Sequence, residues 1–295
     1  NETPEGGKLK RFFWPFLFFV LRFGGAATFR PYTVLYYQSL AFTGAQTGIL
    51  SGITPLVSLV SMPLITGFAD RTQKHKLIMS LSLIAAVLGL ILYPFLDNFL
   101  PIFVLTIIIT LFQSPVGPLS DSAALFMLGD QKNLFSRVRL GGTLGFSVAA
   151  TLAGTLVESQ GLKAAFWGAA LVFLAAFLVS LKLTHSRKER SENLQKGRAF
   201  DLIKNPRFLL FLIIVFTGGL ANATINTYLF PYMKALGARE SIMGLALTMG
   251  TVAELPILFF ASHFIKKFQA YSLIVFSTLV TCLRFLLLAV SPSPA

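Results

Sequence analysis

The sequence predicts an all-α membrane protein of nine transmembrane helices. Of its 295 residues, 55% are hydrophobic and only 13% are charged, whereas a soluble globular protein carries about 25% charged residues. Uncharged stretches such as 77–96 and 208–233 are long enough to cross the hydrocarbon core of a bilayer, which takes about 20 apolar residues in a helix. These observations predict a multi-pass protein of the lipid bilayer.

Nine expected spans follow one another along the chain, and their grouping predicts two bundles. We expect a six-helix N-terminal bundle (1–184), a basic cytoplasmic linker (185–207) and the first three helices of a C-terminal bundle (208–295). Transporters often nest three-helix units within each half, so three further helices would complete the pattern, and we expect the sequence to be a fragment. The expected spans are 12–38, 46–66, 77–96, 99–127, 138–157, 164–183, 208–233, 241–262 and 269–290.

The excess of positive charge sets the expected topology. The formal net charge is +13, and most of the Lys and Arg residues fall in alternate loops, at 8–11, 71–76, 132–137, 182–207 and 266–267. Loops rich in Lys and Arg stay on the cytoplasmic side, so we expect a cytoplasmic N-terminus and a place in the cell membrane. Because topology explains the basicity, nucleic-acid binding is a weak alternative.

Cysteine and histidine are too sparse to predict a metal or redox site. Cys282 is the single cysteine, and His75, His185 and His263 are not spaced as metal ligands. The first span is too long for a signal peptide, and no cleavage site follows it. We therefore expect no cofactor, no metal and no enzymatic activity, and we expect the protein to be a monomer.

The first span is interrupted near its outer end. Gly24 and Gly25 precede "FRPY" (29–32), and Pro31 lacks a helical N–H donor, so we expect a bend there. Two interpretations stay open, a packing irregularity and a helix that lines a cavity. Arg30 belongs either to an outer vestibule or to that cavity. Arg22 lies deeper in the same span, and the sequence indicates no partner for it.

The second and third spans are joined by a short charged loop, "TGFADRTQKHK" (66–76). Arg71 and Lys74 fit a simple cytoplasmic loop, but that interpretation does not explain Asp70 at the end of a span. We expect Asp70 to meet the dipole of a neighbouring helix or an arginine.

The fourth and fifth spans carry a candidate charge pair, Asp121 and Arg139. The midpoint of the two positions is Asp130 in the connecting loop, so a symmetric hairpin places both side chains at equal depth, facing each other. An unpaired charge at mid-bilayer costs about 2.5–3.5 kcal/mol, which pairing lowers. The pair is either a substrate site that a solute hydroxyl or carboxylate joins, or a structural ion pair. Phe146, two turns beyond Arg139, either stacks on a ring-shaped substrate or packs against lipid.

The fifth span also carries a stripe of small residues. Small side chains at every fourth position let two membrane helices approach closely, so we interpret the stripe as a packing face. Its members are Gly141, Gly145, Ala149 and Ala153.

A second candidate pair, Glu254 and Arg284, repeats the hairpin arrangement. Their midpoint is Gln269, and each lies 15 residues from it (254 to 269 to 284), about 22 Å of helix and near the bilayer centre. Pro256 predicts a kink whose freed carbonyls face protein or water. A carboxyl held between desolvation and the charge of Arg284 is the kind of group that proton coupling needs. A structural pair is the alternative.

Together these residues resemble the major facilitator superfamily. The loop at 66–76 is similar to that family's loop between helices two and three, G-x-L-A-D-R-x-G-R-K. It departs at Thr66 and Gln73, where the family has glycine. The matching positions are Ala69, Asp70, Arg71 and Lys74.

The stretches "SPVGPLSDSAAL" and "FSRVRLGGTLGF" resemble the lactose/proton symporter and phenylpropionate permease branch of that family. The resemblance covers essentially the whole chain and implies that Asp121 is the helix-four acid of the substrate site and Arg139 its helix-five partner. Phe146 falls where the lactose permease stacks a tryptophan on the sugar, a departure that leaves room for a different ring.

In the last three spans, the resemblance is less complete. Arg284 falls at the position of the helix-nine arginine that takes part in proton coupling. Glu254 departs from the pattern, because the lactose permease's acid aligns with Thr251, one turn away.

The predicted function is secondary active transport of a small organic solute by alternating access, coupled to protons. We expect the solute to be a sugar, a nucleoside or an aromatic acid. One alternative is a transport-inactive receptor or scaffold; a membrane-embedded enzyme is another, for which the sequence offers no catalytic arrangement. The expected roles are solute binding for Asp121, Arg139, Phe146 and Arg30, proton coupling for Glu254 and Arg284, and closure of the inward gate for Asp70, Arg71 and Lys74.

Overall fold

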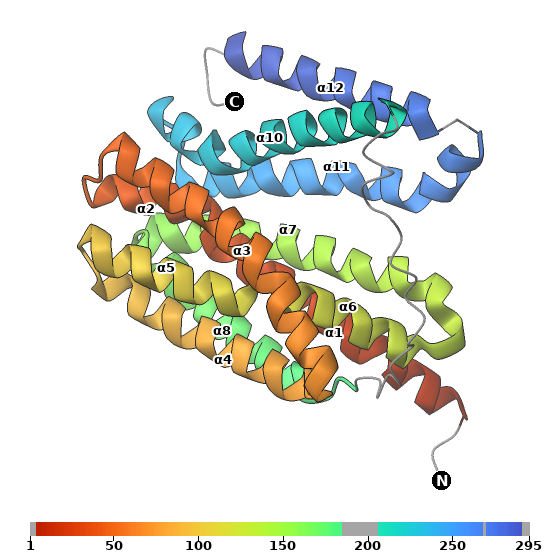
Figure 1. The fold of residues 1–295 in the computed structure, drawn as a ribbon. Helices are drawn as coiled ribbons and strands as arrows, with labels where there is room; N and C mark the ends of the chain where they lie inside the picture. The colour runs from red at the N-terminus through yellow and green to blue at the C-terminus, as the bar shows by residue number, and fades with distance from the viewer. Residues whose placement is uncertain (1–3, 185–205, 268–269, 291–295) are drawn as a thin grey trace. The chain divides into compact units, whose positions relative to one another are not determined.

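The computed structural model describes residues 4–184, 206–267 and 270–290, and every regular element in these ranges is helical (Figure 1). The expected all-α fold is confirmed, and each of the nine expected spans overlaps a described helix. Seven helical segments of the described chain are long and apolar enough to cross a membrane. In chain order the elements are α1 (Pro4–Phe29), η1 (Arg30–Tyr32), α2 (Thr33–Ser39), α3 (Gly44–Thr72), α4 (His75–Leu92), η2 (Tyr93–Phe95), α5 (Phe99–Gln113), α6 (Val116–Leu128), η3 (Gly129–Leu134), α7 (Phe135–Gln160), α8 (Lys163–Ser180), α10 (Pro206–Ala235), α11 (Glu240–Lys267) and α12 (Ala270–Val290).

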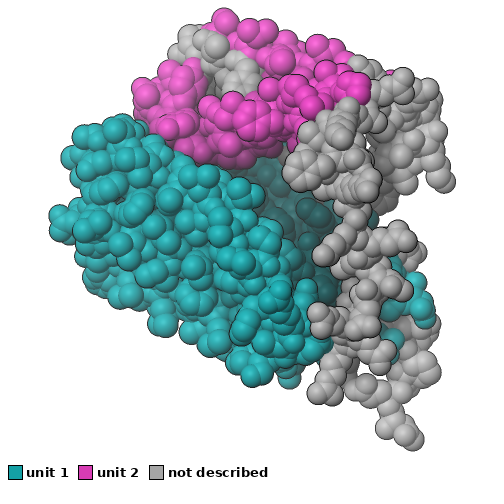
Figure 2. All heavy atoms as spheres, viewed as in Figure 1, with its two compact units in different colours: residues 1–188, 239–255 teal, residues 189–238, 256–295 magenta. Residues whose placement is uncertain are grey.

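The chain divides into two compact units (Figure 2). The first comprises residues 1–188 and 239–255, and the second comprises 189–238 and 256–295. Helix α11 therefore contributes its first half to the first unit. The expected linker lies outside the described residues except at its last two positions.

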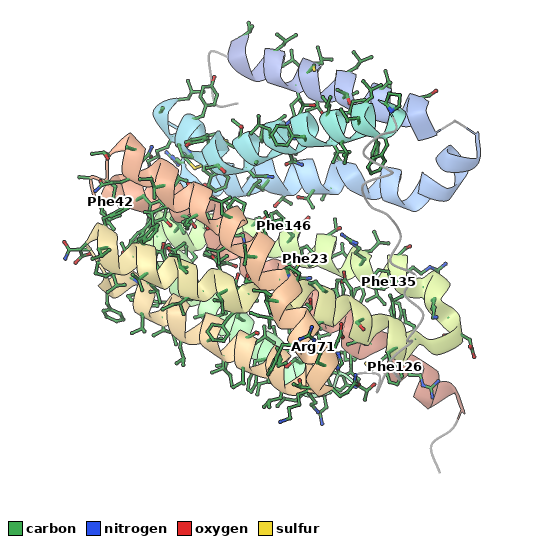
Figure 3. All side chains as sticks on the ribbon, in the orientation of Figure 1. Phe23, Phe42, Arg71, Phe126, Phe135 and Phe146 are labelled. Atoms are coloured by element: carbon green, nitrogen blue, oxygen red, sulfur yellow. The ribbon has the colours of Figure 1, made fainter. Side chains whose placement is uncertain are left out.

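Successive loops of the first unit lie at opposite ends of its helices (Figure 3). Phe42, between α2 and α3, lies at one end, while Arg71, Phe126 and Phe135 lie toward the other. This alternation is what a chain that crosses a membrane repeatedly requires. The outward faces are apolar, with Leu59, Leu152 and Leu171 among the exposed side chains.

The first span breaks at Pro31, as the sequence predicts. The α-helical hydrogen-bond pattern stops at Phe29, a 3₁₀ turn covers Arg30–Tyr32, and α2 then continues to Ser39. Proline has no N–H to donate to the preceding turn, so the break falls where the donor is missing. The three elements still form one apolar span, Arg11–Ser39.

The fourth span contains a proline junction between α5 and α6 that barely disturbs its course. Ser114 and Pro115 both keep right-handed helical backbone angles. The Ser114 N–H donates to the Thr110 carbonyl at 2.9 Å, and the Leu119 N–H donates to the Pro115 carbonyl at 3.1 Å. Residues before and after the junction therefore keep approximately helical spacing, so Gln113 and Gly117 share one side of the span.

The small-residue stripe of α7 packs against α1, which confirms its interpretation as a packing face. A Cβ added at Gly141 would lie 2.8 Å from the Phe16 ring, and one added at Gly145 would overlap the Val20 backbone. Gly24 on α1 meets the same stripe, since its own Cβ would lie 3.4 Å from Ala149 Cβ. This contact holds α1, and the charges it carries, against α7.

Candidate functional site

The site begins with Arg22, the residue for which the sequence indicates no partner. Its guanidinium lies against α6 at Gly117, where an added Cβ would be 2.9 Å from Arg22 Nη2. Any larger residue at position 117 would therefore displace the guanidinium.

Phe23 supports Arg22 from the α1 side. Arg22 Cζ lies 5.0 Å from the centroid of the Phe23 ring, a distance at which a cation is attracted to the face of an aromatic ring. The Phe23 ring in turn fills the space at Gly142 of α7, where an added Cβ would lie 2.7 Å from it. Gly117 and Gly142 thus make room for the Arg22 guanidinium and for the Phe23 ring that supports it.

Three further charges act on the Arg22 guanidinium: Asp121 of α6, Arg30 of η1 and Arg139 of α7. Of these, only Asp121 attracts it. The structure therefore brings three of the sequence-predicted binding residues within electrostatic reach of a fourth charge, Arg22. In the part of the chain that the structure describes, no ion pair of 4.0 Å or less joins Asp121 to Arg139 or to Arg22.

Gln113, on the same side of the fourth span as Gly117, has an unsatisfied hydrogen-bond donor. Its Nε2 is buried and has no hydrogen-bond partner, a costly state for an amide in an apolar environment. Gln113, Gly117 and Asp121 recur at every fourth position, so they form one stripe along the fourth span. The Ser61 and Ser114 hydroxyls, 2.7 Å apart, join α3 to the same region.

The remaining predicted solute residues occupy different surroundings. Phe146 is half-buried on α7 (Figure 3), and Arg30 and Arg139 both keep exposed surface. The roles of Asp121, Arg139, Phe146 and Arg30 in binding a solute stay predictions. Sequence reasoning missed Gln113 and Gly117, although their spacing from Asp121 is visible in "QSPVGPLSD".

The proposed proton-coupling pair lies partly outside the described side chains. Glu254 is in α11, but its side chain is not among those that the structure describes. Arg284 is exposed on α12 and belongs to the second unit. The pairing of Glu254 with Arg284 therefore stays a prediction.

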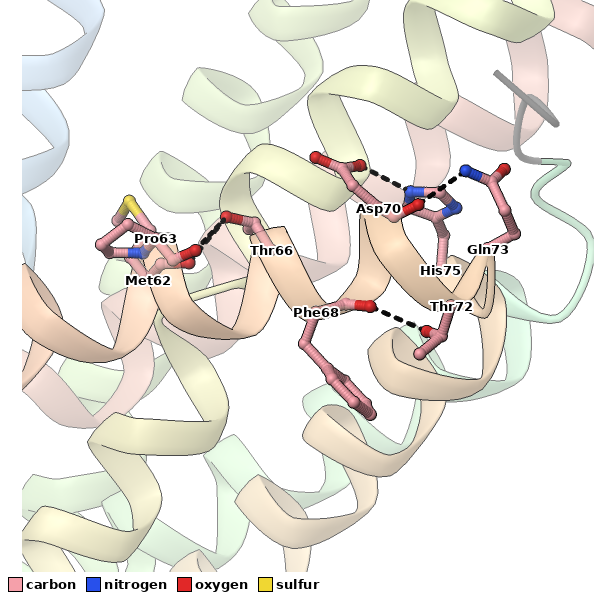
Figure 4. A network of polar contacts seen from close by, with 8 residues as sticks. All are labelled: Met62, Pro63, Thr66, Phe68, Asp70, Thr72, Gln73 and His75. Carbon is pink, nitrogen blue, oxygen red and sulfur yellow. Dashed lines mark hydrogen bonds and ion pairs between the residues drawn. The ribbon is translucent and has the colours of Figure 1, made fainter. Parts of the chain in front are cut away.

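The predicted gating loop contains a side-chain hydrogen bond that joins the end of α3 to the start of α4 (Figure 4). Asp70 Oδ1 lies 2.8 Å from His75 Nε2, and 74% of the Asp70 side chain is exposed. The side-chain partner of Asp70 is thus a histidine rather than an arginine, and this histidine is the first residue of α4. Arg71 and Lys74 are exposed, and their gating role stays a prediction.

The turn of this loop is made by Gln73, where the family pattern has glycine. Gln73 adopts a left-handed φ of 56°, a conformation that glycine takes without steric cost. Its side-chain Nε2 donates to the Asp70 carbonyl at 2.7 Å. Lys76 Nζ donates to the Leu181 carbonyl at 2.7 Å, which ties the loop to the end of α8.

A second close helix contact in the first unit joins α7 to the first half of α11. Gly244 lies against the Ala150 carbonyl, and Gly154 lies against Glu240 and Ser241. The Thr151 and Thr248 hydroxyls are 2.8 Å apart. Sequence reasoning missed this contact, although Ala150 and Gly154 repeat the four-residue spacing of the first stripe.

Comparison with known proteins agrees with this architecture. The model of the MFS_1-like family matches residues 13–295. The chain belongs to the MFS_1-like family. The chain is therefore a member of the major facilitator superfamily of transporters and a multi-pass membrane protein, as the resemblance implies.

Two curated relatives and one solved structure show how far the similarity extends. An uncharacterized transporter of Bacillus subtilis, YwbF, is 31% identical over 281 residues, which cover 94% of this chain and 69% of YwbF. The maltose permease of Geobacillus stearothermophilus is 27% identical over 295 residues, covering 97% of this chain and 73% of the permease. A crystal structure of a mutant of the nucleoside transporter NupG has a TM-score of 0.79 and 18% identity, covering 98% of this chain and 75% of NupG. The NupG likeness shows the fold.

Proposed function

We propose that this protein is a proton-coupled symporter of a small organic solute that works by alternating access in the cell membrane, with its N-terminus in the cytoplasm. The observation that carries the proposal is the charged cluster around Arg22, set within spans whose other residues are mostly apolar. Ionisable residues inside membrane spans are costly and usually belong to a substrate or ion pathway. The family is one of transporters, and the basic loops support the orientation.

The solute class follows from the chemistry of the cluster and from the relatives. Arg22, Asp121 and Gln113 offer charge and hydrogen bonds, which suit a sugar, a nucleoside or an aromatic acid. The matched relatives include a maltose permease and a nucleoside transporter. Phe146 would contribute an aromatic face to a ring-shaped solute, and Glu254 with Arg284 would carry the coupled proton.

The test is uptake by proteoliposomes under an imposed pH gradient. Radiolabelled maltose, uridine and benzoate represent the three solute classes. We expect uptake of one of them to follow the gradient and to collapse when a protonophore is added. Asp121→Asn should reduce that uptake at least tenfold, because it removes the acid of the cluster.

Asp97→Asn is the matched control, since it also removes one carboxylate. Asp97 lies between η2 and α5, 4.0 Å from Lys163, with 69% of its side chain exposed. Uptake that is equally weakened in both variants would contradict the site assignment. Binding of a solute without gradient-driven uptake would favour the transport-inactive receptor.

A further inference from the structure

The charges around Arg22 are unbalanced. The cluster contains three guanidiniums, Arg22, Arg30 and Arg139, and one carboxylate, Asp121. All four lie on helices of the first unit. Their excess of positive charge attracts an anion, most strongly beside Arg22, which is half-buried and so partly shielded from water.

Two hydrogen-bond donors of the cluster also lack acceptors. Arg22 makes no hydrogen bond and no ion pair within the described chain, since its contacts are the surface of Gly117 and the ring of Phe23. The Gln113 amide nitrogen is buried and unpartnered. Gln113 lies one helical turn before Gly117, the residue that Arg22 contacts, so both donors belong to the same face of the fourth span.

A single chemical group satisfies the charge and the donors together. A carboxylate or phosphate oxygen accepts hydrogen bonds from a guanidinium, and two oxygens of one acid group accept them from its planar fork in parallel. A second lone pair of the same group is available to the Gln113 amide. A neutral hydroxyl would accept hydrogen bonds from these donors but would leave the excess of positive charge unchanged.

We propose that Arg22 and Gln113 bind the acid group of an organic anion, so that the transported solute is an organic acid. Gly117 is then a specificity-determining position, because it leaves the space that the Arg22 guanidinium occupies. This inference rests on the proposed transport function. Asp121 attracts the guanidinium while the site is empty, and the arriving acid group provides a second attraction.

The test measures binding to the purified protein with matched pairs of acid and neutral solutes. The pairs are benzoate with benzamide, glucuronate with glucose, and uridine monophosphate with uridine. Binding is measured by calorimetry and by the rise in thermal unfolding temperature that a ligand produces. We expect an acid to bind at least tenfold more tightly than its neutral partner.

The variants then identify the residues responsible. Arg22→Gln should weaken binding of that acid at least tenfold and leave the neutral partner unchanged. Gly117→Ala should weaken it too, because the new Cβ would lie 2.9 Å from Nη2. Gly52→Ala is the control, since nothing lies within 4 Å of a Cβ there. Gln113→Leu supplies an independent test should an Arg22 or Gly117 variant fail to fold.

Each outcome decides between the two proposals. Preferential binding of the neutral members, or acid binding that persists in both Arg22→Gln and Gln113→Leu, overturns the inference and leaves the transport proposal standing. Acid binding that depends on Arg22 but is never followed by gradient-driven uptake supports the acid-binding site at Arg22 and overturns transport of the bound acid. Binding of no member of the panel overturns the inference, and gradient-driven uptake of maltose or another neutral solute then sustains transport alone.

Discussion

Replacing Gly145 by alanine tests the contact between α1 and α7, on which the position of Arg22 depends. An added Cβ would lie 2.6 Å from both the Cα and the carbonyl carbon of Val20. Both are backbone atoms, so no flexible side chain can move aside, and the helices must separate. Overpacking of this kind costs about 1–3 kcal/mol, and contact with backbone places the cost near 3 kcal/mol.

Alanine also favours the helix over glycine by about 1 kcal/mol, so the comparison requires a matched control. Gly52→Ala on α3 makes the same chemical change at an exposed position with nothing within 4 Å of the new Cβ. The propensity gain is common to both variants, and the difference between them isolates the packing cost. We expect Gly145→Ala to be about 3 kcal/mol less stable than Gly52→Ala.

The assay is reversible unfolding of the purified protein in detergent, titrated with sodium dodecyl sulfate. Fluorescence of Trp14, on α1, and Trp167, on α8, reports loss of the native packing. A Gly145→Ala variant as stable as Gly52→Ala would refute the close contact between α1 and α7 and, with it, the placement of Arg22.

Two further predictions concern stability outside the charged cluster. Tyr93→Phe should lower the free energy of unfolding by about 1–3 kcal/mol, because the Tyr93 hydroxyl lies 2.6 Å from that of Tyr37 and 2.9 Å from that of Thr106. Tyr36→Phe is the control and should cost less, since it removes only hydrogen bonds of 3.3–3.5 Å; equal losses in the two variants would contradict the hydroxyl network. Gln73→Gly should raise the unfolding midpoint above that of the wild type, because a non-glycine residue in the left-handed region costs about 1–2 kcal/mol, whereas the lost side-chain bond to Asp70 is exposed. A midpoint below that of the wild type would show that the bond outweighs the backbone cost.

The features that sequence reasoning predicted correctly are those set by local chemistry. Pro31 breaks its helix because a donor is missing there, and the stripe that contains Gly145 packs because small residues at this spacing leave a groove. The long apolar runs become spans for the same reason, since length and composition alone decide whether a helix crosses a bilayer.

The features that sequence reasoning missed depend on which helices become neighbours. Arg22 meets Gly117 from a position 95 residues earlier in the chain, and no local pattern marks that encounter (117 − 22 = 95). Asp70 pairs with His75 because the left-handed turn at Gln73 folds the two helix ends together. The hairpin arithmetic that placed Asp121 opposite Arg139 did not anticipate Arg22, which lies within electrostatic reach of both.

The most direct test of the central claim is pH-gradient-driven uptake across a double-mutant cycle of Arg22→Gln and Asp121→Asn. If both residues serve one solute site, each substitution should reduce uptake at least tenfold. The uptake of the double variant should then equal that of the less active single variant, because the effects of coupled residues are not additive. Losses that multiply in the double variant, or wild-type uptake in either single variant, would contradict the account.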